Sequence, residues 1–470
     1  MRKGQPKAVN KRDQTVPPKL SDAHLAKPVL DALQTLDKAG FQAYLVGGCV
    51  RDMVLGQHPK DYDIATDALP TEVQKLFKKV IPTGIEHGTV TVLQRGLSIE
   101  VTTFRTEGAY IDARRPSSVS FGSDITEDLS RRDFTINAMS FDPIGNRFCD
   151  PFDGSGDLSR RLVRCVGDPR SRFSEDGLRP LRAVRFATVL NFELDPATRE
   201  AIPETLDTFR RIAAERIREE FTKLLLSPRV RFGIEMLRQT GLLSAFAPEL
   251  LEGIGQTQDA SYAGDVYGHV LATVEAAPAT TVLRLAALLH DVSKPRTARR
   301  RPDGSFDFPE HEKLGAAAAE VVLDRLKFPK KTIEDVCLLV QHHRLENPDN
   351  WSDAQIRRLA ARLGVEHLEQ LLQLTEANIR GRERGFAESL AALRQFSQRV
   401  HHVLSENPPL VPKALALDGN AIMRILGIGP SPKVGEATRF LMEKVLDNPA
   451  INSLDSLTEV LQKWANSGAH

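Results

Sequence analysis

LVGGCVRDMVLGQHPKDYDIAT, residues 45–66, holds the most informative pattern of this 470-residue chain. An apolar run leads into Gly47-Gly48, a helical pattern follows, and a second strand-like run comes after it. Paired glycines let a triphosphate approach the backbone, and the next helix N-terminus offers N–H groups to an anion. Arg51 lies in the first turn of that helix, within reach of a phosphate. The pattern therefore predicts a phosphate-binding turn between a strand and a helix.

Three acids near this turn predict a metal site. Asp61 and Asp63 are two residues apart, so on a strand both carboxylates project to the same face. Glu100 lies in SIEVTTF (98–104), a strand that could pair alongside. Clustered carboxylates are costly without a cation, and Mg²⁺ prefers hard oxygen ligands. We therefore expect a two-ion Mg²⁺ site for phosphoryl transfer. An isolated DxD is more often a solvated edge strand, but the glycine turn upstream favours the metal site.

Strand-like runs are confined to the first third of the chain, at 43–46, 62–66, 89–93 and 98–104, with a helical pattern over 71–80. Helical patterns replace them from about residue 155 onward. The expected fold class is α+β, with a small mixed-sheet head followed by a long all-helical neck, body and tail. The expected divisions are a basic leader (1–22), the head (23–150), the neck (151–250), a helical domain (251–380) and the tail (381–470).

Composition excludes several classes of protein. The chain has no run of 18 apolar residues, so we expect no membrane span. The first 20 residues carry six basic residues and one acid, which is typical of a disordered leader and unlike a secretory signal. The four cysteines show no CxxC spacing, which favours a reducing, cytoplasmic location. A net charge of +1 neither indicates nor excludes binding of nucleic acid. Any phosphate-binding surface must therefore be a local patch of basic residues, balanced by acids elsewhere.

Seven motifs carry a family resemblance: GGCVRD, DYDIAT, IPTGIEHGTVTV, EVTTFR, RRDFTINAM, DPFDG and EDGLRPLRAVRF. In order and spacing they resemble the class II CCA-adding tRNA nucleotidyltransferases and bacterial poly(A) polymerases, over about residues 25–250. The resemblance implies a nucleotidyltransferase-type head. It also implies Asp61 and Asp63 as Mg²⁺ ligands, Glu100 as the third catalytic carboxylate, and Gly48, Arg51, Arg132 and Asp133 as nucleotide-binding residues. Asn137 is expected to be structural.

An acid and a base three residues apart, Asp176 and Arg179, could select the base without a template. Cytosine and adenine both present an amino donor beside a ring-nitrogen acceptor, whereas uracil and guanine present the reverse. An aspartate accepts from the amino group and an arginine donates to the ring nitrogen, so the wrong bases would leave buried polar groups unpaired. The family uses this motif in the same way. Arg182 and Arg185 would hold phosphates or ribose. If Asp176 caps the helix, Pro180 falls at its fourth position, where the missing N–H does little harm.

The loop EGAYIDARRPSSV (107–119) separates two activities of the family. It resembles the flexible loop of CCA-adding enzymes, in which Asp112, Arg114 and Arg115 would be the working residues, although solvent exposure alone also produces mobile charged loops. We therefore expect an enzyme that adds CCA to the tRNA 3′ end from CTP and ATP and recognises tRNA mainly by shape. Poly(A) tailing of RNA is the alternative.

A second constellation has the order H…HD…H…H, formed by His269, His290-Asp291, His311 and the His342-His343 pair, from which His342 is taken as the ligand. It resembles the HD phosphohydrolase domain, whose imidazoles and carboxylate bind divalent metals. Asn378 stands where that family has a closing aspartate, and an amide is a poorer ligand. A second divalent metal is expected here. The alternatives are a metal-dependent phosphodiesterase or phosphatase with an RNA-binding head, and a relic domain kept for RNA or homodimer contacts.

Overall fold

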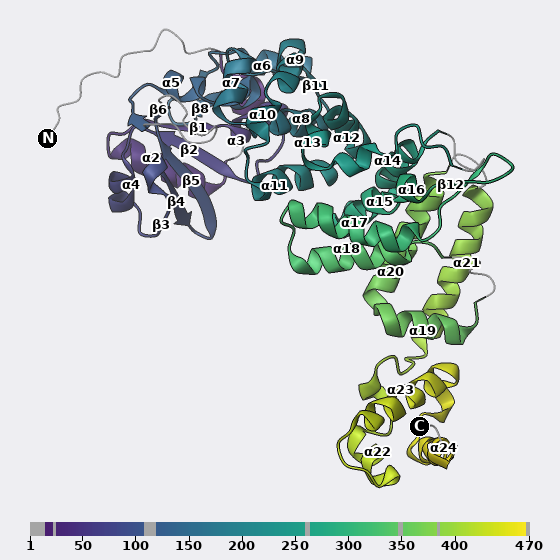
Figure 1. Ribbon diagram of the computed structural model, residues 1–470. Helices are drawn as coiled ribbons and strands as arrows, with labels where there is room; N and C mark the ends of the chain where they lie inside the picture. Colours follow the sequence, from purple (N-terminus) through teal and green to yellow (C-terminus); the bar gives the residue numbers. More distant parts are fainter. Residues whose placement is uncertain are drawn as a thin grey trace. The chain divides into compact units, whose positions relative to one another are not determined.

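The computed structural model describes residues 15–21, 25–107, 119–258, 264–345, 351–382 and 386–466 (Figure 1). The chain divides into two compact units, Met1–Pro248 and Glu249–His470. The boundary between them falls where the sequence places the end of the neck. The finer division into five parts stays a prediction.

Seven strands of the first unit form one mixed sheet, in the order β3-β4-β5-β2-β1-β8-β9. Only β2 and β5 run parallel; their neighbours pair antiparallel. The strands are β1 (Ala43–Val46), β2 (Tyr62–Thr66), β3 (Val80–Gly84), β4 (Thr89–Gln94), β5 (Leu97–Thr103), β8 (Ser140–Asp142) and β9 (Arg147–Cys149). The four expected strands are therefore confirmed to within a residue. The helix expected over 71–80 is too long, because α4 (Pro70–Leu76) ends before β3 begins.

The centre of the sheet is buried on both faces. Leu45 of β1 and Ile64 and Ala65 of β2 are fully buried. Helices α2 (Lys27–Lys38) and α3 (Gly48–Leu55) pack against these strands. Successive residues of a strand point to opposite faces, so an apolar run such as β2 fits only the middle of a covered sheet. This fixes the register of β2 and with it the position of Asp63.

The rest of the first unit is mostly helical. Its helices are α5 (Ile125–Ser130), α6 (Gly154–Arg160), α7 (Pro169–Glu175), α8 (Arg179–Leu190), α9 (Pro196–Glu204), α10 (Leu206–Phe209), α11 (Ala214–Leu225), α12 (Val230–Gln239) and α13 (Leu242–Phe246). Two short strands, β10 (Leu162–Val163) and β11 (Glu193–Leu194), pair in parallel. The neck was expected to be wholly helical, and these two strands correct that expectation. Strand β11 follows α8 and pairs with β10, the strand that precedes α7.

The second unit is built on helices. They are α14 (Val266–Ala276), α15 (Thr281–Leu289), α16 (Lys294–Thr297), α17 (His311–Arg325), α18 (Lys330–His342), α19 (Asp353–Leu363), α20 (Val365–Arg380), α21 (Phe386–Ser405), α22 (Gly419–Leu426), α23 (Pro432–Asp447) and α24 (Leu454–Asn466). A hairpin of β12 (Arg299–Arg300) and β13 (Phe306–Asp307) corrects the all-helical expectation here too, because a tight turn at Gly304 lets the two strands pair. The α+β class with a mostly helical body is confirmed. Within the described ranges, no helix is both long and apolar enough to cross a bilayer.

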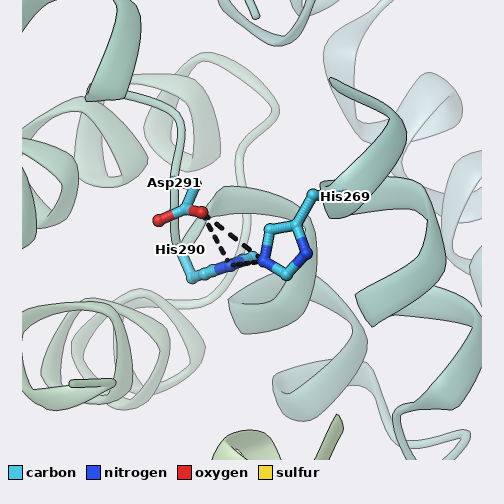
Figure 2. A group of neighbouring side chains, drawn as sticks. All are labelled: His269, His290 and Asp291. Carbon is cyan, nitrogen blue, oxygen red and sulfur yellow. Dashed lines mark hydrogen bonds and ion pairs between the residues drawn. The ribbon is translucent and has the colours of Figure 1, made fainter. Parts of the chain in front are cut away.

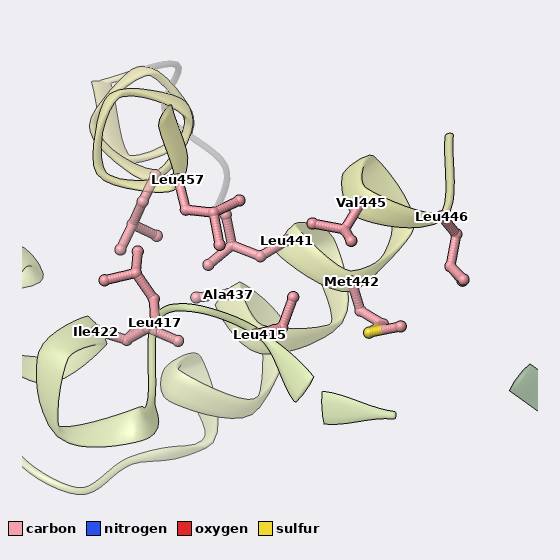
Figure 3. Packing of buried hydrophobic residues seen from close by; sticks show 10 residues of the cluster. Leu415, Leu417, Ile422, Ala437, Leu441, Met442, Val445, Leu446 and Leu457 are labelled. Carbon is pink, nitrogen blue, oxygen red and sulfur yellow. The ribbon is translucent and has the colours of Figure 1, made fainter. Parts of the chain in front are cut away.

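The last three helices share a hydrophobic core (Figure 3). Ile422 of α22, Leu441 of α23 and Leu457 of α24 are each fully buried in it. Helices of 8, 16 and 13 residues gain most of their stability from packing rather than from helix propensity. The three helices therefore depend on this shared core.

We expect Leu457→Ala to lower the free energy of unfolding of this region by about 2–5 kcal/mol, because it empties a fully buried site. Leu454→Ala is the matched control: it lies on the same helix, is 60% exposed, and should change stability by less than about 0.5 kcal/mol. Urea denaturation can be followed by fluorescence of Trp464, which stacks on Phe440 in this core, in a Trp351→Phe background. Equal losses in the two variants would contradict the packing.

Candidate functional site

The turn between β1 and α3 leaves room that a side chain would fill. Gly47 has φ +72°, a left-handed conformation that favours glycine. A Cβ atom there would lie 3.0 Å from Nη1 of Arg132 and 3.4 Å from Oδ2 of Asp63. The glycine therefore allows a guanidinium and a carboxylate to close in on the backbone. Since α3 begins at Gly48, its first N–H groups, which have no partner within the helix, also lie at this turn.

The carboxylates of the predicted metal site lie on neighbouring strands. Asp63 is half-buried in β2, and the parallel register sets it opposite Glu100 of β5. Asp61 precedes the first residue of β2, and both Asp61 and Glu100 are exposed. The oxygens of the three acids do not all lie within 4.8 Å of one another. The structure thus brings the acids to adjacent positions without closing them into a tight cluster.

The pKa of Asp63 is raised above its ordinary value of 3.8. It is raised to about 6, mainly by burial and also by the charges of Glu100 and Asp61, while the guanidinium of Arg132 lowers it. Mutual repulsion of carboxylates in a partly desolvated place is what a bound cation relieves. The residues therefore fit a divalent cation.

Arg132 is held in place by Asp128, a fully buried acid of α5. Nη2 of Arg132 donates to Asp128 at 3.1 Å, and Nη2 of Arg131 donates to the other carboxylate oxygen at 2.6 Å. Nε of Arg132 is buried and has no hydrogen-bond partner in the described part of the chain. Arg132 thus stands over the glycine turn with a donor to spare.

Asn137 links the predicted nucleotide-binding residues to one another. Its Oδ1 accepts from Nη1 of Arg51 at 2.8 Å, and its Nδ2 donates to Asp133 at 3.2 Å. Asp133 also accepts from Nε and Nη2 of Arg182 at 2.9 and 2.6 Å. Burial would raise the pKa of Asp133, but Arg182 brings it down to about 2. Asn137 therefore positions Arg51 and Asp133, a role that its place in the RRDFTINAM motif could have signalled.

The proposed base-reading pair is engaged with other residues of the neck. Arg216 of α11 donates to both oxygens of Asp176, at 2.9 and 3.3 Å. Arg179 is 7% exposed and donates to Glu175 at 2.6 Å. The role of Asp176 and Arg179 in base choice stays a prediction. Arg216 lies 40 residues along the chain from Asp176, so no local pattern announced it.

Asp176 does not cap the helix that contains Pro180, so the condition considered for that proline is not met. Helix α7 ends at Glu175, and Leu178 is the residue before α8. Asp176 instead accepts from the backbone N–H of Leu178 at 3.0 Å in the intervening turn. Pro180 is then the second residue of α8, where its missing N–H costs no helical hydrogen bond.

Arg182 and Arg185 are both paired with an acid of α11. Nε of Arg185 donates to Glu220 at 2.7 Å, and Nη1 of Arg182 lies 3.6 Å from the other oxygen. The guanidinium of Arg185 also lies 3.5 Å from the ring centre of Phe186. Their predicted contact with phosphate or ribose is not tested. The flexible-loop residues Asp112, Arg114 and Arg115 lie outside the described residues.

A second site lies in the other unit, where four imidazoles surround Asp291. Figure 2 shows the first two, His269 and His290, whose Nε2 atoms lie 3.6 and 3.1 Å from Oδ2 of Asp291. On the other side, Nε2 of His311 and of His343 each lie 3.6 Å from Oδ1. All five side chains are buried. We call these five residues the imidazole cluster.

Main-chain carbonyls fix the orientation of each ring. The Nδ1 atoms lie beside the carbonyls of Gly381, Ala287, Phe308 and Val340, at 3.3, 2.8, 2.7 and 2.7 Å for His269, His290, His311 and His343. A carbonyl only accepts, so Nδ1 carries the hydrogen and the Nε2 lone pair points inward. Burial lowers the pKa of His269 to about 3 and that of His311 to about 4, which keeps these rings neutral.

The convergence of lone pairs is the test of whether a metal ion fits. The Nε2 atoms of His269 and His290 lie 3.3 Å apart, so two lone pairs would face each other without a cation or proton between them. Oδ1 of Asn378, at the position of the expected closing ligand, is buried and has no hydrogen-bond partner among the described residues. Neutral imidazoles with one carboxylate form a donor set for zinc-like divalent ions. The cluster fits such an ion.

Two features of this cluster differ from the sequence prediction. His343 completes it, and the expected ligand His342 does not. The two residues are consecutive at the end of α18, so their side chains point about 100° apart. Lys294, which the sequence analysis missed, lies 2.8 Å from Oδ2 of Asp291 and donates to Gln258 at 2.7 Å. Its spacing of three residues from Asp291 in HDVSK was the available signal.

Comparison with known sequence families covers the three main parts of the chain. Residues 43–164 match the family described as "Poly A polymerase head domain". Residues 191–253 match the "Probable RNA and SrmB- binding site of polymerase A", and residues 266–378 match the "HD domain". The resemblance found in the sequence is thereby confirmed for both the head and the HD-type domain.

Individual relatives are CCA-adding enzymes. Those of Lactobacillus johnsonii and Lactobacillus helveticus are 50% and 51% identical over 213 and 225 residues, which is 45% and 48% of this chain and 53% and 55% of theirs. The matched part is thus only about half of each relative. The crystal structure of Bacillus stearothermophilus CCA-adding enzyme in complex with CTP has 28% identity and a TM-score of 0.72, covering 94% of this chain and 99% of its own.

In metal-free protein, we expect Asp63→Asn to raise the free energy of unfolding at neutral pH by at most about 3 kcal/mol. The native pKa of Asp63 is about 6 and the ordinary value is 3.8. As pH rises between these values the unfolded carboxyl ionises first, so the natural protein loses stability that the variant keeps. The gain should be near zero at pH 4 and constant above about pH 7. Urea denaturation in EDTA across this range measures it, and a gain that does not change with pH would contradict the assignment.

Proposed function

We propose that this chain adds CCA to the 3′ end of tRNA, using CTP and ATP. The observation that carries this proposal is the pairing of Asp63 with Glu100 across parallel strands, beside a glycine turn that Arg132 overhangs. A protein that only binds RNA would gain nothing from carboxylates beside a phosphate, because the two negative groups repel each other. The arrangement therefore favours catalysis over RNA binding alone. The CCA-adding relatives and the structural match to an enzyme with CTP support the same activity.

The residues of the head divide the work of nucleotidyl transfer. Asp61, Asp63 and Glu100 would hold Mg²⁺, and when bound Mg²⁺ stabilises charge on the attacked phosphate and lowers the pKa of the attacking 3′-hydroxyl. The turn at Gly47 lets the triphosphate reach backbone N–H groups of α3. Arg132 would offer Nη1, which lies beside Gly47, to the same phosphates. The chain's own residues would therefore position the triphosphate and neutralise its charge.

Base choice is proposed to lie with Asp176 and Arg179. Each would exchange its charged partner, Arg216 for Asp176 and Glu175 for Arg179, for one edge of cytosine or adenine. The exchange keeps both charged groups paired, which a buried site requires. Recognition of tRNA would fall to the region of residues 191–253, whose family is described as a probable RNA-binding site.

The decisive assay offers transcripts of one tRNA that end before, within and after CCA, with CTP and ATP alone and together. We expect C addition from CTP alone and a single A on the CC-ended tRNA from ATP alone. Asp63→Asn should reduce incorporation at least about 100-fold, because a metal ligand is lost, while tRNA binding stays within about twofold. Asp455→Asn, an exposed acid of α24, is the control. Long A tails on unstructured RNA would instead identify a poly(A) polymerase.

The imidazole cluster supports a second candidate function, metal-dependent hydrolysis of a phosphate ester. His269, His290, Asp291, His311 and His343 would hold a divalent ion, which when bound supplies Lewis-acid stabilisation of the ester. Lys294 lies beside Asp291 and can donate to a phosphate oxygen. Asn378 in place of a carboxylate lowers the negative charge of the site.

Two adjacent histidines test the metal site sharply. In an Asp63→Asn background, which weakens the head site, Co²⁺ binding to metal-free protein can be measured by titration calorimetry. We expect His343→Ala to weaken binding at least about tenfold, because one inward lone pair is lost. His342→Ala should leave it within about twofold, since that ring faces away from the cluster. Equal effects of the two substitutions would contradict the assignment.

A further inference from the structure

A hairpin next to the imidazole cluster is used by neither proposed function. It consists of β12 and β13, which turn at Gly304, and the chain reaches His311 of the cluster four residues after β13. We propose that one face of this hairpin binds single-stranded RNA, with a phosphate at Arg300 and bases against Phe306 and Phe308. This binding requires neither nucleotide addition by the head nor a metal ion in the cluster.

The register of the hairpin places Arg300 beside a phenylalanine. Arg300 pairs with Phe306, and Arg299 pairs with Asp307. Residues directly opposite in an antiparallel pair share a face, and successive residues of a strand point to opposite faces. Arg300 and Phe306 therefore lie on one face, and Arg299 lies on the other face with Asp307. Nη2 of Arg301, two residues from Arg299, lies 3.2 Å from Asp307, as this alternation requires.

The first of these faces offers a cation and two aromatic rings to a ligand. Phe306 and Phe308 are half-buried and nearly parallel, with ring centroids 6.4 Å apart and planes at 25°. Arg300 is exposed and forms no hydrogen bond or ion pair with any residue that the structure describes. Arginine binds phosphate through charge-assisted hydrogen bonds, and bases stack on aromatic rings whatever their sequence. We call Arg300, Phe306 and Phe308 the arginine–phenylalanine face.

Phe308 connects this face to the imidazole cluster. Its ring meets that of His311 edge to face, with centroids 6.5 Å apart and planes at 73°. Nζ of Lys294 lies 5.3 Å from the ring centre of Phe308 and 2.8 Å from Oδ2 of Asp291. A strand bound along the face would therefore have a phosphodiester next to the cluster. RNA is then the substrate class for the metal-dependent hydrolysis proposed above, and only this last step rests on that proposal.

Single-stranded RNA fits the arginine–phenylalanine face better than a duplex or an acidic peptide does. In a duplex the bases stack on one another, so their flat faces are not available to the two rings. An acidic peptide could pair with Arg300 but has no base for the phenylalanines. The segment 299–308 contains three arginines and two aspartates, a net charge of +1, so attraction by charge alone is small. Stacking must therefore supply much of the affinity.

Two consecutive arginines on opposite faces make a matched test. An unstructured RNA decamer containing 4-thiouridine is crosslinked by light to the full-length protein in EDTA, and the tryptic peptide that carries Phe306 and Phe308 is quantified at each RNA concentration. We expect Arg300→Gln to raise the concentration for half-maximal crosslinking at least about fivefold, because a charge-assisted hydrogen bond to phosphate is lost. Arg299→Gln removes the same charge from the other face and should change it less than about twofold. Equal effects of the two substitutions would overturn the proposal.

A second set of measurements separates stacking from charge and binding from hydrolysis. Phe306→Leu keeps an apolar side chain but removes the ring, and should weaken crosslinking at least about fivefold. A glutamate decamer that competes as well as unlabelled RNA, or the absence of this peptide among the crosslinked products, would overturn the proposal. His343→Ala should leave crosslinking within about twofold, because the binding needs no metal ion. RNA that crosslinks here but is not cleaved by the Co²⁺-loaded protein would confirm the binding face and contradict only the proposed hydrolysis.

Discussion

The parallel pairing of β2 with β5 is the constraint on which the head is built. It sets Asp63 opposite Glu100 in a sheet whose centre is otherwise apolar, so the fold keeps two like charges side by side. Burial is the main cause of the raised pKa of Asp63, and the charges of Glu100 and Asp61 add to it, so a cation bound here would stabilise the ionised carboxylates. The glycine turn and Asp128 both act on this pair of acids. The turn leaves room for Arg132 next to Asp63, and the buried Asp128 holds Arg132 in that position.

The imidazole cluster follows the same logic with different chemistry. In the head, the carboxylates of Asp61 and Glu100 are exposed to solvent. Such a site suits a hard ion that keeps some of its water ligands. In the second unit, the donors are imidazoles whose Nδ1 atoms lie beside main-chain carbonyls, all buried around one acid. Desolvation there disfavours extra negative charge, so neutral nitrogen ligands replace carboxylates. Each unit thus contains a group of side chains that fits a cation. The ligands are carboxylates where the site is exposed to solvent and mainly imidazoles where it is buried.

The local parts of both sites were predictable from the sequence, and the long-range parts were not. Alternation and glycine punctuation located β1, β2, β4 and β5, and through them Asp63 and Glu100. Consecutive histidines at a helix end left the ligand ambiguous, because only the helical phase decides between His342 and His343. The helix over 71–80 was overextended since Val80 serves an edge strand. Arg216 is separated by 40 residues from Asp176, so only the packing of α11 beside α8 reveals their pairing.

That pairing limits where base selectivity can arise. If Arg216 and Glu175 occupy Asp176 and Arg179 in the free protein, every incoming nucleotide must first displace them. A closed resting state lowers the affinity for all ligands by the same factor, the fraction of protein that is open. It cannot favour cytosine over uracil by itself. Under the proposed base choice, discrimination would therefore come from the paired edge, where the correct base gives Asp176 and Arg179 new partners and a wrong base leaves these two side chains without partners.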